Sequence, residues 1–264
     1  MNLKKIAIIG FFVLLAGAAI SIVMNVKDTL VNKSDELTVK ESYTNIDIQS
    51  DNASVEIIPT KNNHTEVKFS GKMKQKSKYL FNVDVKGDTL YVELKEKDWR
   101  FIQFGFTSLD IKLIVYVPEK EYEELRTEIN NGRIIAEGLQ VEDVNLGTDN
   151  GSIELKNVQA QTVSVETDNG QILMDEVGGE INAKTDNGRI LLTTSNLERF
   201  INLKTDNGLI EIQTDKEPSN VTIHAKVDLG KIDVFGSSNK QTIFGNGTNL
   251  IKLETDNGKI SVSK

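Results

Sequence analysis

The chain has 264 residues, a formal net charge of −8 and no cysteine. Disulfide bonds and cysteine-ligated metal sites are therefore excluded, and burial and hydrogen bonding must hold the fold together. An acidic chain lacks the basic face that binding to a phosphate backbone requires, which argues against DNA or RNA as a partner. With 38% hydrophobic residues, 27% charged residues and three prolines, the composition is typical of a globular protein.

The N-terminus carries an apolar run. Two lysines precede residues 6–24, a stretch of 19 residues in which Ser21 is the only polar side chain. A helix of that length can cross a hydrocarbon layer of ~30 Å, and the lysines favour a cytoplasmic N-terminus and an extracytoplasmic body. A cleaved signal peptide is the alternative, with an A-x-A site at residues 16–18. We expect residues 1–24 to be an uncleaved transmembrane anchor and residues 25–42 to be a polar linker.

Residues 43–118 are rich in predicted strands but lack a regular period. Residues 46–57, IDIQSDNASVEI, are expected to form an irregular first copy of the unit that repeats later in the chain. Several further strand-like segments follow, with a hairpin turn at Gly87-Asp88. Residues 119–126, EKEYEELR, are predicted to be a helical turn or a polar loop.

Residues 119–264 contain a repeat built on Thr-Asp-Asn-Gly, which begins at residues 148, 167, 185, 205 and 255. Successive glycines of the aligned units are 19, 19, 18, 20, 22 and 28 residues apart: Gly132, Gly151, Gly170, Gly188, Gly208, Gly230 and Gly258. An isoleucine stands two residues after each of them. Apolar residues alternate on both sides of Asn-Gly, which predicts two short strands joined by a tight turn. The Thr and Asp before the turn are expected to hydrogen-bond to turn amides.

One such unit buries little apolar surface alone, so stacking is required. The predicted fold is all-β: a β-solenoid, or β-helix, of about seven to eight rungs. A β-sandwich of hairpins is the alternative, and the uniform isoleucine column favours the solenoid. Leu229 replaces the repeat asparagine, and the last two steps are wide, so the C-terminal rungs are expected to carry an insertion.

The N-terminal anchor, the β-rich segment, the sequence VYVP at residues 115–118 and the TDNG-x-I repeat resemble a bacterial family. This is the "putative adhesin" family, a domain of unknown function found in membrane-anchored LiaG-like proteins of Firmicutes. The resemblance covers roughly residues 43–264. It implies an extracytoplasmic cell-envelope protein associated with envelope stress, and it brings no catalytic residues.

The TDNG repeat has two interpretations. Stacked rungs would place one carboxylate every ~4.8 Å, a column that calcium could bind. One aspartate per rung supplies too few oxygens for an ion that prefers six to eight, so structural turns are favoured. The candidate cation ligands are Asp149, Asp168, Asp186 and Asp206. The candidate turn residues are Asn150, Gly151, Asn169, Gly170, Asn187, Gly188, Asn207, Gly208, Asn257 and Gly258.

Aromatic residues and histidines are the remaining candidates. Trp99, Phe101, Phe104 and Phe106 are expected either to contact a membrane or partner, or to cover an open end of the solenoid. The two histidines, His64 in a loop and His224 on a solvent-facing strand position, lie in no recognisable nucleophile motif.

The sequence therefore predicts a single-pass membrane protein with an extracytoplasmic, non-catalytic body that binds or scaffolds. No cofactor is expected, except calcium if the aspartate column binds it. The expected partners are the membrane and an envelope protein or cell-wall polymer. A purely structural module would instead self-associate through an exposed last strand at residues 260–262. A calcium-binding adhesin surface and a glycan-active enzyme on a β-helix are the alternative functions.

Overall fold

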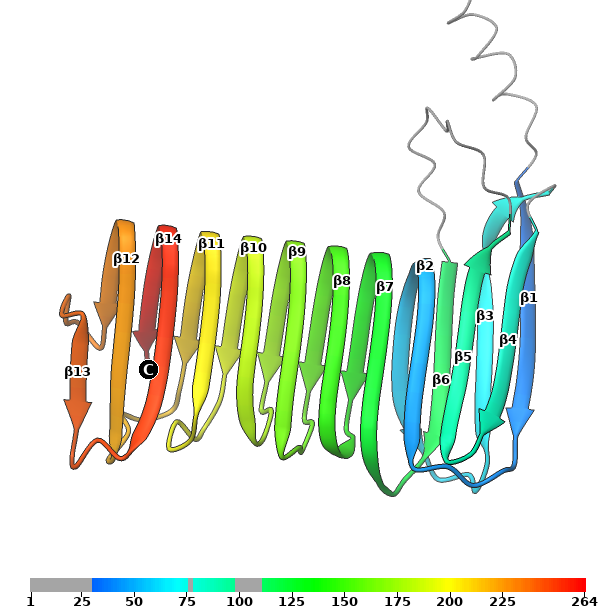
Figure 1. Cartoon of the computed structure of the whole chain (residues 1–264), viewed down its shortest axis with the longest axis horizontal. Helices are drawn as coiled ribbons and strands as arrows, with labels where there is room; N and C mark the ends of the chain where they lie inside the picture. The colour runs from blue at the N-terminus through cyan, green and yellow to red at the C-terminus, as the bar shows by residue number, and fades with distance from the viewer. Residues whose placement is uncertain (1–29, 76–77, 98–110) are drawn as a thin grey trace, which may run out of the picture.

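The computed structural model describes residues 30–75, 78–97 and 111–264. Fourteen strands form one hydrogen-bonded sheet in the order β1-β3-β6-β2-β7-β8-β9-β10-β11-β14-β12-β13, with β5 and β4 attached at β2 (Figure 1). Within these residues no helix is long and apolar enough to span a membrane. The predicted anchor, residues 1–24, lies outside the described part of the chain.

The sheet is a β-solenoid of eight rungs, as predicted. The rungs are β2 (Asn45–Thr60), β7 (Glu121–Glu137), β8 (Gln140–Lys156), β9 (Thr162–Asp175), β10 (Glu180–Thr193), β11 (Ile201–Gln213), β12 (Val221–Val234) and β14 (Asn249–Ser263). Each rung strand bends at one corner, so that its two halves lie in two facing layers (Figure 1). Instead of two strands around a tight turn, each rung is one continuous strand. Parallel pairing passes through the corner, as at Asn150↔Asn169 and Gly151↔Gly170.

The core lies between the two layers and follows the alternation in the sequence. Six of the seven isoleucines that follow the repeat glycine are fully buried: Ile134, Ile153, Ile172, Ile190, Ile210 and Ile260. Each lies opposite the same residue of the neighbouring rung, so like side chains stack in columns. The seventh, Ile232, is only partly buried, because β12 is the last rung.

The N-terminal part continues the two layers beyond the first rung. Its strands are β1 (Leu30–Val39), β3 (Thr65–Lys74), β4 (Tyr79–Lys86), β5 (Thr89–Glu96) and β6 (Ile111–Pro118). As predicted, β2 is the first rung: Asn52 and Ala53 pair with Asn131 and Gly132 of β7. On its other side, the first half of β2 pairs with β5 and the second half with β6. The predicted hairpin turn joins β4 to β5, where Gly87 has a φ of 64°.

Two predictions for this region are wrong. Residues 30–39, expected to belong to a linker, form β1 and pair antiparallel with β3. Residues 121–126, expected to be a helical turn or loop, begin β7. The many glutamates of this segment make it look like a polar loop in the sequence. Its apolar residues nevertheless point into the core, and Tyr122 and Leu125 are 1% and 0% exposed.

The C-terminal rungs do not follow chain order in space. β14 lies between β11 and β12, so that Asn257 pairs with Asn207 on one side and with Leu229 on the other. After β11 the chain leaves one rung position free, forms β12 and the short β13 (Gln241–Phe244), and returns to fill the gap. This detour accounts for the two wide steps in the repeat. The expectation that residues 260–262 form an exposed last strand is wrong, because Ile260 and Val262 are buried between two rungs.

The corner glycines allow neighbouring backbones to approach closely. A Cβ on Gly170 would lie 1.6 Å from the carbonyl oxygen of Gly151, and at the other stacked corner glycines the same distance is 1.6–2.1 Å. Gly132 and Gly151 also have φ values of 132° and 150°, which side chains disfavour. Ala53 is tolerated at this position in the first rung, where the neighbouring strands β5 and β6 pair only with residues on either side of the corner.

We predict that Gly170→Ala destabilises the protein by about 3 kcal/mol or more, because a backbone carbonyl cannot move aside as a side chain can. Gly147→Ala is the matched control: it lies in the adjacent rung, and its nearest neighbour would be the Glu128 side chain at 4.0 Å. Chemical denaturation of both variants measures the difference. Equal stability of the two would contradict this description of the corner.

Candidate functional site

The corner edge of the solenoid carries a continuous chain of asparagine amides, here termed the Asn ladder. Each Nδ2 donates to the Oδ1 of the preceding rung over 2.8–3.1 Å. The members are Asn52, Asn131, Asn150, Asn169, Asn187, Asn207 and Asn257. Stacked amide ladders of this kind stabilise parallel in-register strands. Leu229, which interrupts the pattern in the sequence, stands beyond Asn257 at the end of the Asn ladder.

The threonines of TDNG have a different role from the predicted one. Five of them, Thr148, Thr167, Thr185, Thr205 and Thr255, are at most 5% exposed and point into the core. Their Oγ1 atoms have no hydrogen-bond partner. The prediction that they bond to turn amides is therefore wrong, since the strand alternation directs them inward. Val227 of β12 occupies the same column, opposite Thr255.

We expect Thr185→Val to leave stability unchanged or raise it by up to ~1 kcal/mol, because the substitution removes a buried, unpaired hydroxyl and keeps the branched shape. Ser50→Ala is the contrasting variant, because the buried Ser50 hydroxyl donates to the carbonyl of Leu94 at 2.9 Å. It is expected to lose ~1 kcal/mol. Denaturation midpoints compare the two, and a clear loss for Thr185→Val would show that the hydroxyl is used.

The aspartates of TDNG project from the corner towards solvent. Asp149 and Asp168 are exposed, while Asp186 and Asp206 lie 3.3 Å and 3.8 Å from the ammonium groups of Lys184 and Lys204. These lysines offset the like-charge repulsion that a bound cation would otherwise relieve. Within residues 30–75, 78–97 and 111–264, no three His, Cys, Asp or Glu side chains gather as a metal site would require.

The other candidates from the sequence do not come together. Trp99, Phe101, Phe104 and Phe106 lie outside the described residues. His64 lies in the loop between β2 and β3, whereas His224 is exposed on β12 at the opposite end of the solenoid, as its strand position predicted.

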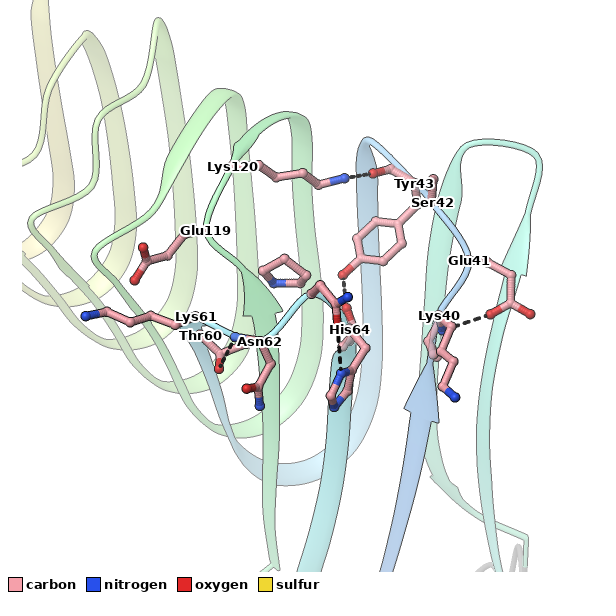
Figure 2. Close-up of a pocket in the computed structure, with 14 residues that line it drawn as sticks. Lys40, Glu41, Ser42, Tyr43, Thr60, Lys61, Asn62, His64, Glu119 and Lys120 are labelled. Carbon is pink, nitrogen blue, oxygen red and sulfur yellow. Dashed lines mark hydrogen bonds between the residues drawn. The ribbon is translucent and has the colours of Figure 1, made fainter.

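A cavity of about 490 Å³ lies where three connections of the N-terminal part meet (Figure 2). They are the β1–β2 loop, the β2–β3 loop and the β6–β7 loop, which contribute residues 40–43, 61–64 and 119–120. The cavity lies at the edge opposite the Asn ladder, because β1, β2 and β6 end at that edge and β3 and β7 begin there (Figure 1). Its lining includes three lysines and two glutamates: Lys40, Lys61, Lys120, Glu41 and Glu119.

Lys120 is the most constrained cation of this cavity. Its ammonium donates to the backbone carbonyl of Tyr43 and lies 4.8 Å and 4.9 Å from the ring centroids of Tyr43 and Tyr122. The two rings stack with their centroids 5.9 Å apart. The Tyr122 hydroxyl is fixed in turn by donating to the carbonyl of Pro118 at 2.8 Å. Burial lowers the pKa of Lys120 from its ordinary value, so the charged ammonium has lost part of its hydration.

His64 is held in place on the opposite side of the cavity. Its Nε2 lies 3.1 Å from a carboxylate oxygen of Glu66, and its Nδ1 lies 3.3 Å from the Asn63 side chain. Hydrogen bonds from Lys68 and then His64 lower the pKa of Glu66, so this carboxylate is ionised at neutral pH. A second hollow of about 270 Å³ adjoins the first and shares Lys120 with it. The sequence does not reveal this site, because only the strand order brings the three loops together.

Comparison with known families identifies the repeat. Residues 43–177 and 136–263 both match the family model described as Toastrack DUF4097. The chain belongs to this family. The match confirms the resemblance to a domain family of unknown function, and the all-β solenoid is the Toastrack fold. No curated protein matches the chain.

Solved structures similar to this Toastrack chain share low sequence identity with it. A "putative cell adhesion protein" from Clostridium sporogenes is 12% identical, with 89% of this chain and 99% of the other covered and a TM-score of 0.41. A "putative adhesin" from Bacteroides fragilis is 14% identical, with 88% of this chain and 96% of the other covered and a TM-score of 0.42. A "putative lipid binding protein" from Parabacteroides distasonis is 15% identical, with 84% of this chain and 97% of the other covered and a TM-score of 0.32.

Proposed function

We propose that this Toastrack protein is a non-catalytic binding protein of the bacterial cell envelope. In this proposal residues 6–24 anchor it in the membrane with the solenoid outside the cytoplasm. The cavity around Lys120 binds an anionic group, a carboxylate or phosphate, of an envelope polymer. The observation that carries the proposal is the position of the Lys120 ammonium, which donates to the Tyr43 carbonyl and lies beside two aromatic rings in a cavity with more lysines than glutamates.

The chemistry of Lys120 supports an anionic ligand. An ammonium group has three N–H donors, and one of them is directed to the Tyr43 carbonyl. Burial disfavours the charged form of the ammonium. A bound anion would accept a hydrogen bond from one of the remaining N–H groups and would stabilise the positive charge. Lys40 and Lys61 add two further cations at the rim, and Asn62 and His64 offer polar contacts (Figure 2).

The direction of β1 determines which edge of the solenoid would face the membrane in this proposal. Leu30 begins β1 at the edge that carries the corners, and Val39 ends it at the cavity (Figure 1). Five residues lie between Met24 and Leu30, so the six Cα–Cα steps reach at most ~20 Å. With residues 6–24 in the membrane, the start of β1 lies close to the lipid surface. The cavity then opens ~30 Å further out, the length of a ten-residue strand.

The binding proposal predicts that Lys120→Met weakens binding at least tenfold, because methionine keeps the apolar stem and removes the charge. The full chain in detergent is titrated with cell-wall fragments before and after extraction of their anionic polymers, and with phosphatidylglycerol vesicles. Loss of binding on extraction assigns a wall polymer, whereas binding to vesicles assigns a lipid headgroup. Lys156→Met is the control, since Lys156 is an exposed lysine of β8 near Glu137. Equal binding by Lys120→Met and wild type would refute the cavity as the site.

The anchoring proposal predicts that the full chain stays with the membrane fraction after alkaline extraction, with its solenoid digested only by protease added outside the cytoplasmic membrane. A chain starting at Asn25 should lose membrane attachment. A full chain that is released by alkali, or that is protected from outside protease in intact spheroplasts, would contradict the orientation.

A further inference from the structure

The C-terminal end of the solenoid leaves half of a strand edge open. β12 pairs with β14 along one side. On its other side, β13 covers only residues 221–224, and Ala225 donates to the carbonyl of Lys240. From Lys226 to Asp233 no strand in the described chain pairs with this outer edge. Leu229, at its centre, is 70% exposed. Such an edge is a template for pairing with another strand.

The sequence of this open edge, KVDLGKID at residues 226–233, is complementary to itself when reversed. In an antiparallel pairing centred between Leu229 and Gly230, Lys226 faces Asp233 and Asp228 faces Lys231. Val227 then faces Ile232, and Leu229 faces Gly230. Each charged residue thus meets the opposite charge, each inward apolar residue meets another, and the bulky leucine meets the residue without a side chain.

The orientation of the side chains agrees with this pairing. Val227 and Ile232 are partly buried against the core from one side only, so an opposing Ile232 and Val227 would complete their burial. Asp228 and Lys231 are exposed on the outer surface, where opposite charges would meet. Because β12 bends at this corner, a two-fold axis through the corner places the first half of one strand against the second half of the other.

We propose that the β12 edge is a self-association surface on which a second copy of this chain docks end to end. The contact is isologous, so residues 226–233 of both copies form the same interface and the assembly closes as a dimer. Both N-terminal parts lie at the far ends of the dimer. The two-fold axis passes through the corner edge, so the corner edges of both copies lie on the same side of the dimer. The two β1 strands then begin on that side, as two anchors in one membrane require.

Single-cysteine cross-linking tests the contact directly, because the natural chain has no cysteine. The register places position 228 of one copy directly opposite position 231 of the other, within the Cα separation that a disulfide spans. Under mild oxidation a mixture of Asp228→Cys chains and Lys231→Cys chains in detergent is expected to form a covalent dimer. A mixture of Asp228→Cys and Ile243→Cys chains is the control: Ile243 is 57% exposed at the same end, on β13 and away from the axis, and this mixture should stay monomeric. Failure of the Asp228→Cys and Lys231→Cys mixture to cross-link would overturn the proposal.

Charge exchange tests the register. Asp228→Lys places two lysines opposite each other twice per dimer, and light-scattering mass measurements should show at least tenfold weaker association. The double variant Asp228→Lys with Lys231→Asp keeps the net charge of the wild type and restores opposite charges, so association should return. Thermal melts check that both variants fold. If a folded Asp228→Lys variant associates like wild type, or the folded double variant fails to recover, the proposed register is wrong.

Discussion

The close, in-register contact between successive corners is the constraint on which the rest of this structure depends. A Cβ on a corner glycine would lie within about 2 Å of a carbonyl oxygen of the preceding rung, so every corner that stacks on another corner in that direction needs a residue without a side chain. The adjacent asparagines then bond amide to amide across the rungs. With the corner fixed in this way, the alternation on both sides places the isoleucine columns in one continuous core. The chain can therefore do without disulfides.

Much of this architecture follows from local sequence. The TDNG spacing and the constant isoleucine predict a solenoid, and the Asp-Asn-Ala of residues 51–53 predicts its first rung. The order of the rungs in space cannot be predicted from local sequence. The spacing between repeats gives the length of chain between two strands, but it does not determine which strands pair. Leu229 breaks the repeat in the sequence, but in space it stands at the end of the Asn ladder. Thr185 and its equivalents carry polar groups into the core, which turn chemistry alone does not predict. The Lys120 cavity cannot be predicted from local sequence either, since Tyr43, His64 and Lys120 come together only through the pairing of β1, β2, β3 and β6.

The two ends of the solenoid differ in chemistry, and the proposed functions follow this difference. The N-terminal part has separate strands with long connections, and those connections build the polar cavity (Figure 2). The regular rungs between the ends carry matched ion pairs such as Arg189–Glu211 at 2.8 Å. At the C-terminal end, β13 covers half of the last rung and leaves residues 226–233 open. A rigid spacer thus separates a proposed ligand site from a proposed dimer contact.

Corner stacking places β14 between β11 and β12. Pairs of cysteines on the outward column that contains Lys204, Glu254 and Lys226 test it most directly, since in-register neighbours lie within disulfide range. We expect intramolecular cross-links for Lys204→Cys with Glu254→Cys and for Glu254→Cys with Lys226→Cys. We expect none for Lys204→Cys with Lys226→Cys, which are two rungs apart. A ready cross-link in this last pair, with none between Lys204→Cys and Glu254→Cys, would mean that the rungs stack in chain order.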